Sequence, residues 1–196
     1  MVRHLELAAR GWTPANWLDQ YYPEDLPEEW RLSYYANEHR FVLVPQAIWA
    51  AANDLDQWLD DLTEPFGFHL QIETAEADMA RFVHVSSGLG RHYRGAVLTL
   101  PERDVPDALL DAAGAAGPVC STRGIPGTKQ CWVPGAGQAD AGLGLISIKD
   151  HPEPPALRAI IEEFAEASGP EQGLMYVDSP RQVFETLKTL AELMGL

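Results

Sequence analysis

Short apolar runs alternate along this chain with segments that have helical or turn-rich patterns. The runs are rich in branched and aromatic residues and are bounded by Gly, Pro or polar residues, which predicts β-strands. The predicted strands cover residues 2–8, 41–45, 68–72, 82–86, 95–100, 119–122, 143–149 and 174–177.

Helical patterns follow several of these runs. Residues 154–167 are the clearest case, because their apolar side chains recur at three- and four-residue spacing. Further helices are predicted over residues 47–62 and 105–116. A last helix follows Ser179 and Pro180, which suit an N-cap and a first helical position.

Regular alternation of strand and helix indicates parallel strands joined by right-handed crossovers, and eight such units close into a barrel. We therefore predict one α/β domain over residues 1–196, a compact (β/α)8 TIM-like barrel that can be degenerate in its middle. In it the strand at 2–8 pairs with the strand at 174–177. The length of 196 residues lies near the lower limit for this fold. An open parallel α/β sheet is the alternative, because hydrophobic periodicity does not report closure.

One segment breaks the alternation. Residues 123–144 are dense in Gly and Pro and have no helical period, so we expect a long loop in place of the sixth crossover helix. Ile125 and Trp132 favour partial packing of this loop on the body of the protein. We predict that it forms a lid over the C-terminal mouth of the barrel.

Alternate positions of the predicted strands are apolar and polar. The apolar set, which includes Leu5, Leu7 and Leu70, should face the helices, and the other set should face the lumen. A polar lumen is unusual for a barrel. The predicted lumen-facing residues are His4, Glu6, His69, Gln71, His84, Ser86, Ser147, Lys149, Tyr176 and Asp178.

Active sites of βα barrels gather at the carboxyl ends of the strands. We predict that Glu6, His84, Lys149 and Asp178 converge near that end as the catalytic group. The predicted ligand-binding residues are Trp12, in the wall of the site, Ser86 and Arg123. Further candidates at strand ends are Gln46, Glu73 and Asp150. The alternative is structural, with a Lys149–Asp178 ion pair and buried side chains that satisfy one another's hydrogen bonds.

The charge balance restricts the partners. The chain has 29 acidic and 14 basic residues, for a net charge of −15, which disfavours nucleic acids and anionic membranes. The expected partner is a small-molecule ligand or another protein. The start of the chain has no signal-peptide pattern and no stretch reaches membrane-spanning length, so the cytoplasm is the expected location.

Cofactor and metal motifs are weak or missing. The two cysteines, Cys120 and Cys131, fit neither a disulfide scaffold nor a zinc spacing. The Gly-containing stretch at 86–92 could hold an anion but lacks the P-loop and dinucleotide patterns, and a plain turn is the better interpretation. We expect no cofactor, and a metal site at His69, His84 and Glu6 is a minority hypothesis.

The segment after the first strand resembles the opening of the YecE-like family, a group of βα-barrel proteins of unassigned function. The similarity rests on Gly11-Trp12, Tyr22-Pro23, Leu26-Pro27, Trp30 and Tyr34-Tyr35-Ala36. The order of strands and helices at the C-terminal end is also similar. The resemblance implies a βα barrel.

The second strand departs from the family pattern. Where the family carries Glu, Asn and Tyr, this chain has Leu43, Pro45 and Trp49. These departures indicate a shortened, divergent member that has lost most of the family's polar residues.

Three functions remain open. The first is a barrel that binds a small, anionic ligand at its C-terminal mouth and is either an enzyme or a binder. Lys149 and Arg123 would suit a phosphate or carboxylate. The second is a non-catalytic scaffold or regulatory module with a decayed site and an acidic, protein-binding surface. The third is a metal-dependent phosphodiesterase-like barrel.

Overall fold

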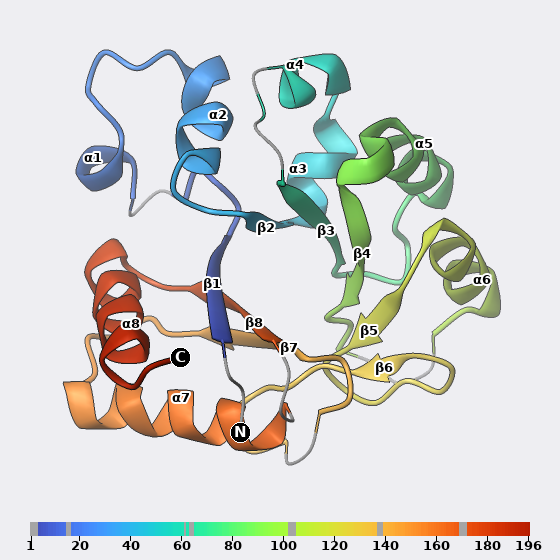
Figure 1. The fold of residues 1–196 in the computed structure, drawn as a ribbon. Helices are drawn as coiled ribbons and strands as arrows, with labels where there is room; N and C mark the ends of the chain where they lie inside the picture. Colours follow the sequence, from blue (N-terminus) through green and yellow to red (C-terminus); the bar gives the residue numbers. More distant parts are fainter. Residues whose placement is uncertain are drawn as a thin grey trace.

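A sheet of parallel strands curls around the centre of the molecule (Figure 1). The computed structural model describes residues 4–14, 17–60, 62, 65–101, 105–136, 139–168 and 172–196. The strands are β1 (His4–Arg10), β2 (Phe41–Val44), β3 (Gly67–Ile72), β4 (Tyr93–Leu98), β5 (Val119–Ser121), β6 (Lys129–Gln130), β7 (Leu143–Ser147) and β8 (Gln172–Asp178). Their order across the sheet is β6-β5-β4-β3-β2-β1-β8-β7. The predicted pairing of the first strand with the last is confirmed, with six paired positions from His4 to Ala9.

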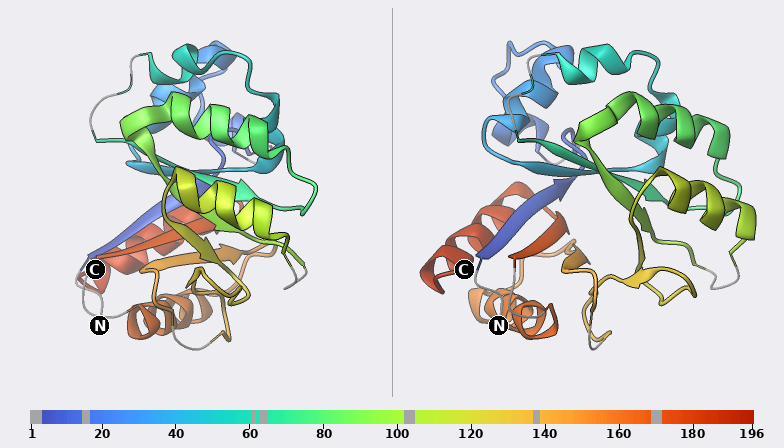
Figure 2. Two further views of the ribbon diagram at one scale, coloured as in Figure 1. Left: turned by 90° about the vertical axis from the view of Figure 1, so that its right-hand side faces the viewer. Right: turned by 45° about the vertical axis from the view of Figure 1, so that its right-hand side comes forward.

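Helices cover the outer face of the curled sheet (Figure 2). They are α1 (Leu18–Tyr21), η1 (Glu28–Trp30), α2 (Arg31–Ala36), α3 (Gln46–Ala51), α4 (Leu55–Leu59), α5 (Met79–Leu89), η2 (Gly90–His92), α6 (Asp107–Ala116), α7 (Pro154–Ala167) and α8 (Arg181–Leu193). The helix predicted over 47–62 is divided into α3 and α4. Ala52 leaves the helical conformation, and the Asp54 carboxylate caps α4 through the Gln57 amide at 3.1 Å.

The two edge strands, β6 and β7, are joined by one residue, so the prediction of a TIM-like barrel holds. The Trp132 amide donates to the Leu143 carbonyl at 2.8 Å, and the Leu145 amide donates to the Trp132 carbonyl at 2.9 Å. Elsewhere the strands form regular parallel ladders, such as the five paired positions of β7 and β8. Closure of the barrel therefore rests on one β-bridge, beside which the Asp140 and Ala141 amides, just before β7, both donate to the Gln130 carbonyl of β6 at 3.1 Å.

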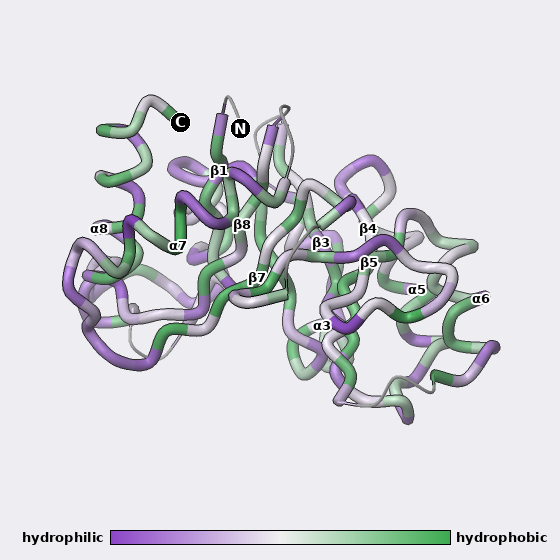
Figure 3. Tube along the Cα trace, turned by 90° about the horizontal axis from the view of Figure 1, so that it is seen from below, coloured by the Kyte–Doolittle hydropathy of each residue, from purple (hydrophilic) through white to green (hydrophobic). Residues whose placement is uncertain are grey.

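Apolar side chains lie on both faces of the sheet. The larger core lies between the sheet and the helices, and it takes in the outward-facing Leu5, Leu7 and Leu70 as predicted. In Figure 3, hydrophobic and hydrophilic stretches alternate along α8, whose buried face carries Phe184 and Leu187. No helix among the described residues is long and apolar enough to cross a lipid bilayer.

The lumen is less polar than predicted. Its buried residues form a second, smaller cluster, Ala8, Leu43, Val97, Cys120, Cys131, Leu143 and Tyr176. Within it, the Tyr176 hydroxyl and His69 Nδ1 are hydrogen-bonded at 2.6 Å. Burial, with a smaller effect from the Arg94 guanidinium, lowers the pKa of His69 to about 3. Burial also raises the pKa of Tyr176 well above its usual range, so both groups are neutral near pH 7.

Tyr35 of α2 enters the gap between β1 and β2. Within the described residues these two strands pair only at Ala9–Val42 and Arg10–Leu43. Next to these two pairs, the Tyr35 hydroxyl accepts from the Ala9 amide at 2.9 Å and donates to the Phe41 carbonyl at 3.0 Å. The Tyr35 hydroxyl thus takes the place of a backbone hydrogen bond between β1 and β2 where the two strands separate.

The strand predicted at 82–86 is wrong, because these residues belong to α5. Phe82, Val85 and Leu89 are buried at helical spacing, whereas Val83 is 42% exposed. The Asp78 carboxylate caps the helix through the Arg81 amide at 3.0 Å. The fourth strand of the sheet is instead the run predicted near 95–100.

The lid predicted at 123–144 is also wrong. The segment contains β6, and its buried Ile125 and Trp132 join the core outside the sheet. Further along, the Gly135 amide donates to Glu163 Oε1 at 2.9 Å, and the Ala139 amide donates to the Ala167 carbonyl at 3.4 Å. The later part of this segment therefore packs on α7, outside the sheet, and Pro126 to Thr128 lie beside α6. The described residues of the segment form no helix, as predicted.

Gly144 gives a test of the closure. A Cβ there would lie 2.7 Å from Phe164 Cε2 and 3.1 Å from Trp132 Cε3. Gly144→Ala should lower the free energy of unfolding by about 1–3 kcal/mol, measured by urea denaturation, because the core must shift. Gly114→Ala is the matched control, since it lies exposed within α6 with nothing within 4 Å of its Cβ. It should stabilise by roughly 0.5–1 kcal/mol. Equal stability of Gly144→Ala and the wild type would contradict the tight packing.

His69 gives a test of the buried lumen. The unfolded chain binds a proton at His69 below pH 6.5, whereas the folded chain does not until about pH 3. The contribution of neutral His69 to the free energy of unfolding is therefore fully present above pH 6.5 and is lost as the pH drops toward 3. His69→Asn, whose Oδ1 can take the place of Nδ1, should reduce this slope by up to about 1.4 kcal/mol per pH unit in urea titrations. His151→Asn, at an exposed position, is the control and should keep the wild-type slope. An unchanged slope in His69→Asn would show that His69 does not titrate this way.

Candidate functional site

Polar side chains converge at the carboxyl ends of β1, β3 and β8, where parallel strands meet at one edge of the sheet. Arg10 ends β1, Asp178 ends β8, and Glu73 directly follows β3. We use the name mouth cluster for these residues and those that support them, namely Arg10, Gln46, Gln71, Glu73, Thr99 and Asp178. Strand alternation places Arg10 on the same side of β1 as Glu6 and Ala8, toward the lumen.

The Arg10 guanidinium is the centre of the mouth cluster. Its Nε donates to Gln71 Oε1 at 2.8 Å, and its Nη2 donates to Glu73 Oε1 at 2.7 Å. Its Nη1 lies 3.7 Å from Asp178 Oδ2, an ion pair beyond hydrogen-bond distance. The Arg10 side chain remains 28% exposed, so the guanidinium can be reached from solvent.

A second set of hydrogen bonds holds the partners of Arg10 in place. Gln46 Oε1 accepts from the Glu73 amide at 2.7 Å and the Thr74 amide at 3.1 Å, and the Gln46 amide donates to Glu73 Oε2 at 3.1 Å. Gln71 Nε2 donates to Thr99 Oγ1 at 2.9 Å. Groups fixed in this way are preorganised for binding, since little freedom is lost when a ligand arrives.

Of the four predicted catalytic residues, Asp178 lies in the mouth cluster and Glu6 does not. Glu6 lies near the start of β1, at the opposite end of the barrel, with its carboxylate 3.6 Å from His4 Nε2. The prediction that Glu6 and Asp178 converge is therefore wrong. The position of a residue along its strand, and not only the face of the sheet on which its side chain lies, decides at which end of the barrel that side chain is found.

His84 and Ser86 are on α5, outside the strands. His84 is exposed on the outer surface, and the buried Ser86 Oγ donates to the Val83 carbonyl of its own helix at 3.1 Å. Both were assigned to the lumen because residues 82–86 were expected to form a strand. Neither belongs to the mouth cluster.

Lys149 and Arg123 follow the ends of β7 and β5, at the same edge of the sheet as the mouth cluster, and both are exposed. Trp12 follows β1 but turns away from the lumen. It is buried edge-on against Trp58, with ring centroids 4.9 Å apart. Trp12 thus lines a cavity outside the ring of strands.

The metal hypothesis named His69, His84 and Glu6, which do not meet. They lie in the lumen, on the outer face of α5 and at the N-terminal end of β1, respectively. Within the described ranges, no group of three or more His, Cys, Asp or Glu side chains is arranged to hold a metal ion.

Arg10 is the residue that sequence analysis missed. Strand alternation places Arg10 on the same face as Glu6 and Ala8. The predicted strand ends at Ala8, however, because Gly11 follows closely. Gln46 and Glu73 were among the strand-end candidates, and the structure brings both to Arg10.

Comparison with known proteins identifies the fold. No protein-family model matches the chain, and no curated protein matches it. Two crystal structures are similar over almost the whole length. A DUF72 family protein from Thermotoga maritima MSB8 is 12% identical, with 96% of this chain and 99% of that chain covered and a TM-score of 0.65. One from Enterococcus faecalis V583 is 10% identical, with 99% and 98% covered and a TM-score of 0.59. The chain therefore has the TIM-barrel-like fold of DUF72 family proteins, which are YecE-like.

Proposed function

We propose that the mouth cluster binds a small ligand through a carboxylate or phosphate group, with Arg10 as its anchor. The observation that carries this proposal is the partly exposed Arg10 side chain at the C-terminal mouth, whose guanidinium is held on two sides by Gln71 and Glu73. A guanidinium suits a carboxylate or phosphate because its N–H groups form a planar fork.

Nη1 is the nitrogen of Arg10 that is available to a ligand. Within the described residues Nη1 has only the 3.7 Å ion pair with Asp178, whose side chain is 41% exposed. A ligand oxygen can therefore replace the Asp178 carboxylate at Nη1 while Glu73 keeps its hydrogen bond. The exposed cations Lys149 and Arg123 would attract such a ligand and offset the acidic charge of the rest of the protein.

The family relationship supports the same location. We infer that the chain is a divergent, shortened YecE-like protein, from the motif resemblance in residues 11–36 together with the shared fold. In barrels of this type, sites lie at the carboxyl ends of strands, which is where the mouth cluster is.

A binder without catalysis is the second candidate. Leu43 occupies the position at which the family carries Glu, and it is completely buried in the apolar part of the lumen. Below the mouth cluster the structure thus offers packed apolar side chains, which suit a sensor or scaffold better than an acid–base reaction.

Arg10→Met tests the anchor. We expect wild-type melting temperature to rise with at least one member of a panel of sugar phosphates and small dicarboxylates, and isothermal titration to give its Kd. Arg10→Met should weaken that Kd at least tenfold, because one hydrogen bond between charged groups is worth about 1.5–3 kcal/mol. Lys149→Met should weaken it by a smaller factor, since Lys149 is exposed.

The matched control is Arg158→Met. Arg158 also donates from Nε to a carboxylate, Glu162 Oε1 at 2.8 Å, but on the exposed face of α7. It should leave the Kd unchanged. Wild-type affinity in Arg10→Met, with the fold confirmed by circular dichroism, would refute an anion site at Arg10.

A further inference from the structure

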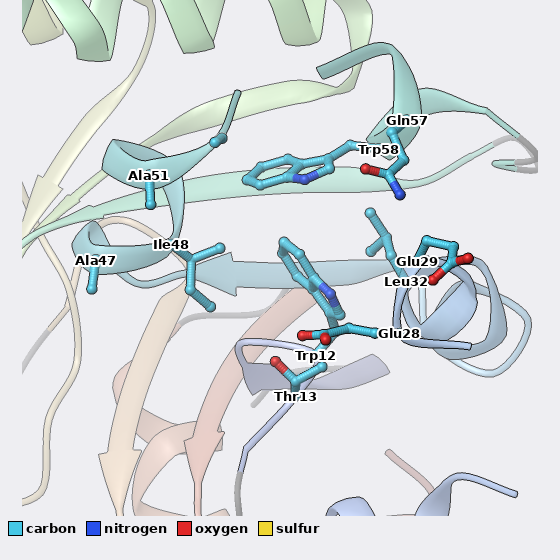
Figure 4. Close-up of a pocket in the computed structure, with 11 residues that line it drawn as sticks. Trp12, Thr13, Glu28, Glu29, Leu32, Ala47, Ile48, Ala51, Gln57 and Trp58 are labelled. Carbon is cyan, nitrogen blue, oxygen red and sulfur yellow. The ribbon is translucent and has the colours of Figure 1, made fainter. Parts of the chain in front are cut away.

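A cavity of about 590 Å³ lies outside the ring of strands, between the loop after β1 and the helices η1, α2, α3 and α4. Figure 4 shows the Trp12 indole pointing at the Trp58 ring, which lies across its end, with Ile48 of α3 on one side and Leu32, Glu28 and Glu29 on the other. Its volume suits a small molecule. We call it the tryptophan cavity.

The two indoles form a corner. Their ring planes meet at 80° with centroids 4.9 Å apart. The Trp58 indole stacks on Phe68 with ring centroids 5.9 Å apart, and the backbone of Trp12 is held by the Tyr22 hydroxyl, which donates to the Trp12 carbonyl. The rings touch edge to face and do not enclose a cage, and the indole surface left facing the cavity is of the kind that attracts quaternary and methylated ammonium groups.

The charge of the lining has the complementary sign. Glu28 and Glu29 are exposed at the rim, and none of the eleven residues that line the cavity is basic. The segment before them adds Glu24 and Asp25. The charged groups that line the cavity are both carboxylates, which repel an anion, whereas a cation gains from the carboxylates and the indole faces.

We propose that the tryptophan cavity is a second binding site and that it takes a small organic cation of the ammonium class. The Trp12 and Trp58 rings contact the cationic head, the Glu28 and Glu29 carboxylates balance its charge, and Leu32 and Ile48 contact its carbon atoms. This site is distinct from the mouth cluster, which has the opposite charge preference. The two sites adjoin at the end of β1, where Arg10 and Trp12 are two residues apart, and at the start of α3, where Gln46 supports Glu73 and Ala47 and Ile48 line the cavity.

Choline and its uncharged isostere, with carbon in place of the quaternary nitrogen, test the proposal by isothermal titration. Choline should bind the wild-type protein and the isostere should bind at least tenfold more weakly, because only choline gains from the rings and carboxylates. Glu28→Gln/Glu29→Gln should weaken choline about tenfold without unfolding the chain, since both side chains are exposed. Trp58→Leu should weaken it by a similar factor.

The control is Glu76→Gln/Glu166→Gln, which removes two exposed carboxylates outside the cavity and should keep the wild-type choline Kd. Arg10→Met should also keep it, so failure of the mouth cluster as an anion site would leave this result intact. The proposal is overturned if choline does not bind, if choline and its isostere bind equally, or if Glu28→Gln/Glu29→Gln matches the wild type.

Discussion

The curled sheet closes at one residue pair, Trp132 and Gly144, and the side chains around this pair pack tightly against it. Trp132 forms the only bridge between β6 and β7 within the described residues, through hydrogen bonds to Leu143 and Leu145. Its indole is completely buried against Phe164 of α7, with ring centroids 5.3 Å apart. Gly144 leaves the space in which both rings meet. Because the described residues between β6 and β7 form no crossover helix, this packing takes the place that a helix has in a regular unit of the fold.

Closure of the barrel also limits the chemistry that is possible in its lumen. A narrow lumen is filled by the cluster around Leu43, Val97 and Tyr176, and His69 is neutral within it. Polar chemistry is therefore confined to the end of the strands, where Arg10, Glu73 and Asp178 are partly exposed. The acidic, aromatic cavity beside Trp12 is separated from that end by the strand β1 and its loop. The two proposed sites can thus be close in space without sharing a ligand.

Much of this fold could be predicted from the sequence because strand alternation is a strong signal in a barrel. The outward-facing Leu5, Leu7 and Leu70 and the inward-facing His69 and Tyr176 follow it directly. The failures have physical causes. Residues 82–86 fit both a strand period and a helix period, and only tertiary packing decides between them. β6 is two residues long, too short for any period, and its place is set by pairing with β5. The mouth cluster was found in part, through Asp178, Gln46 and Glu73, whereas Arg10 was lost to a strand boundary placed two residues early.

Tyr35 shows how such a barrel can change shape without changing its strand order. Its hydroxyl takes the place of a rung between Ala9 and Phe41, so β1 and β2 separate without leaving either backbone group unsatisfied. The angle between neighbouring strands is then set by the position of α2, which carries this side chain, and not by the ladder alone. A shift of one surface helix would tilt the first two strands against each other. Because Ala9 directly precedes Arg10, the geometry at the carboxyl end of β1 depends in part on a helix that contributes no residue to the mouth cluster.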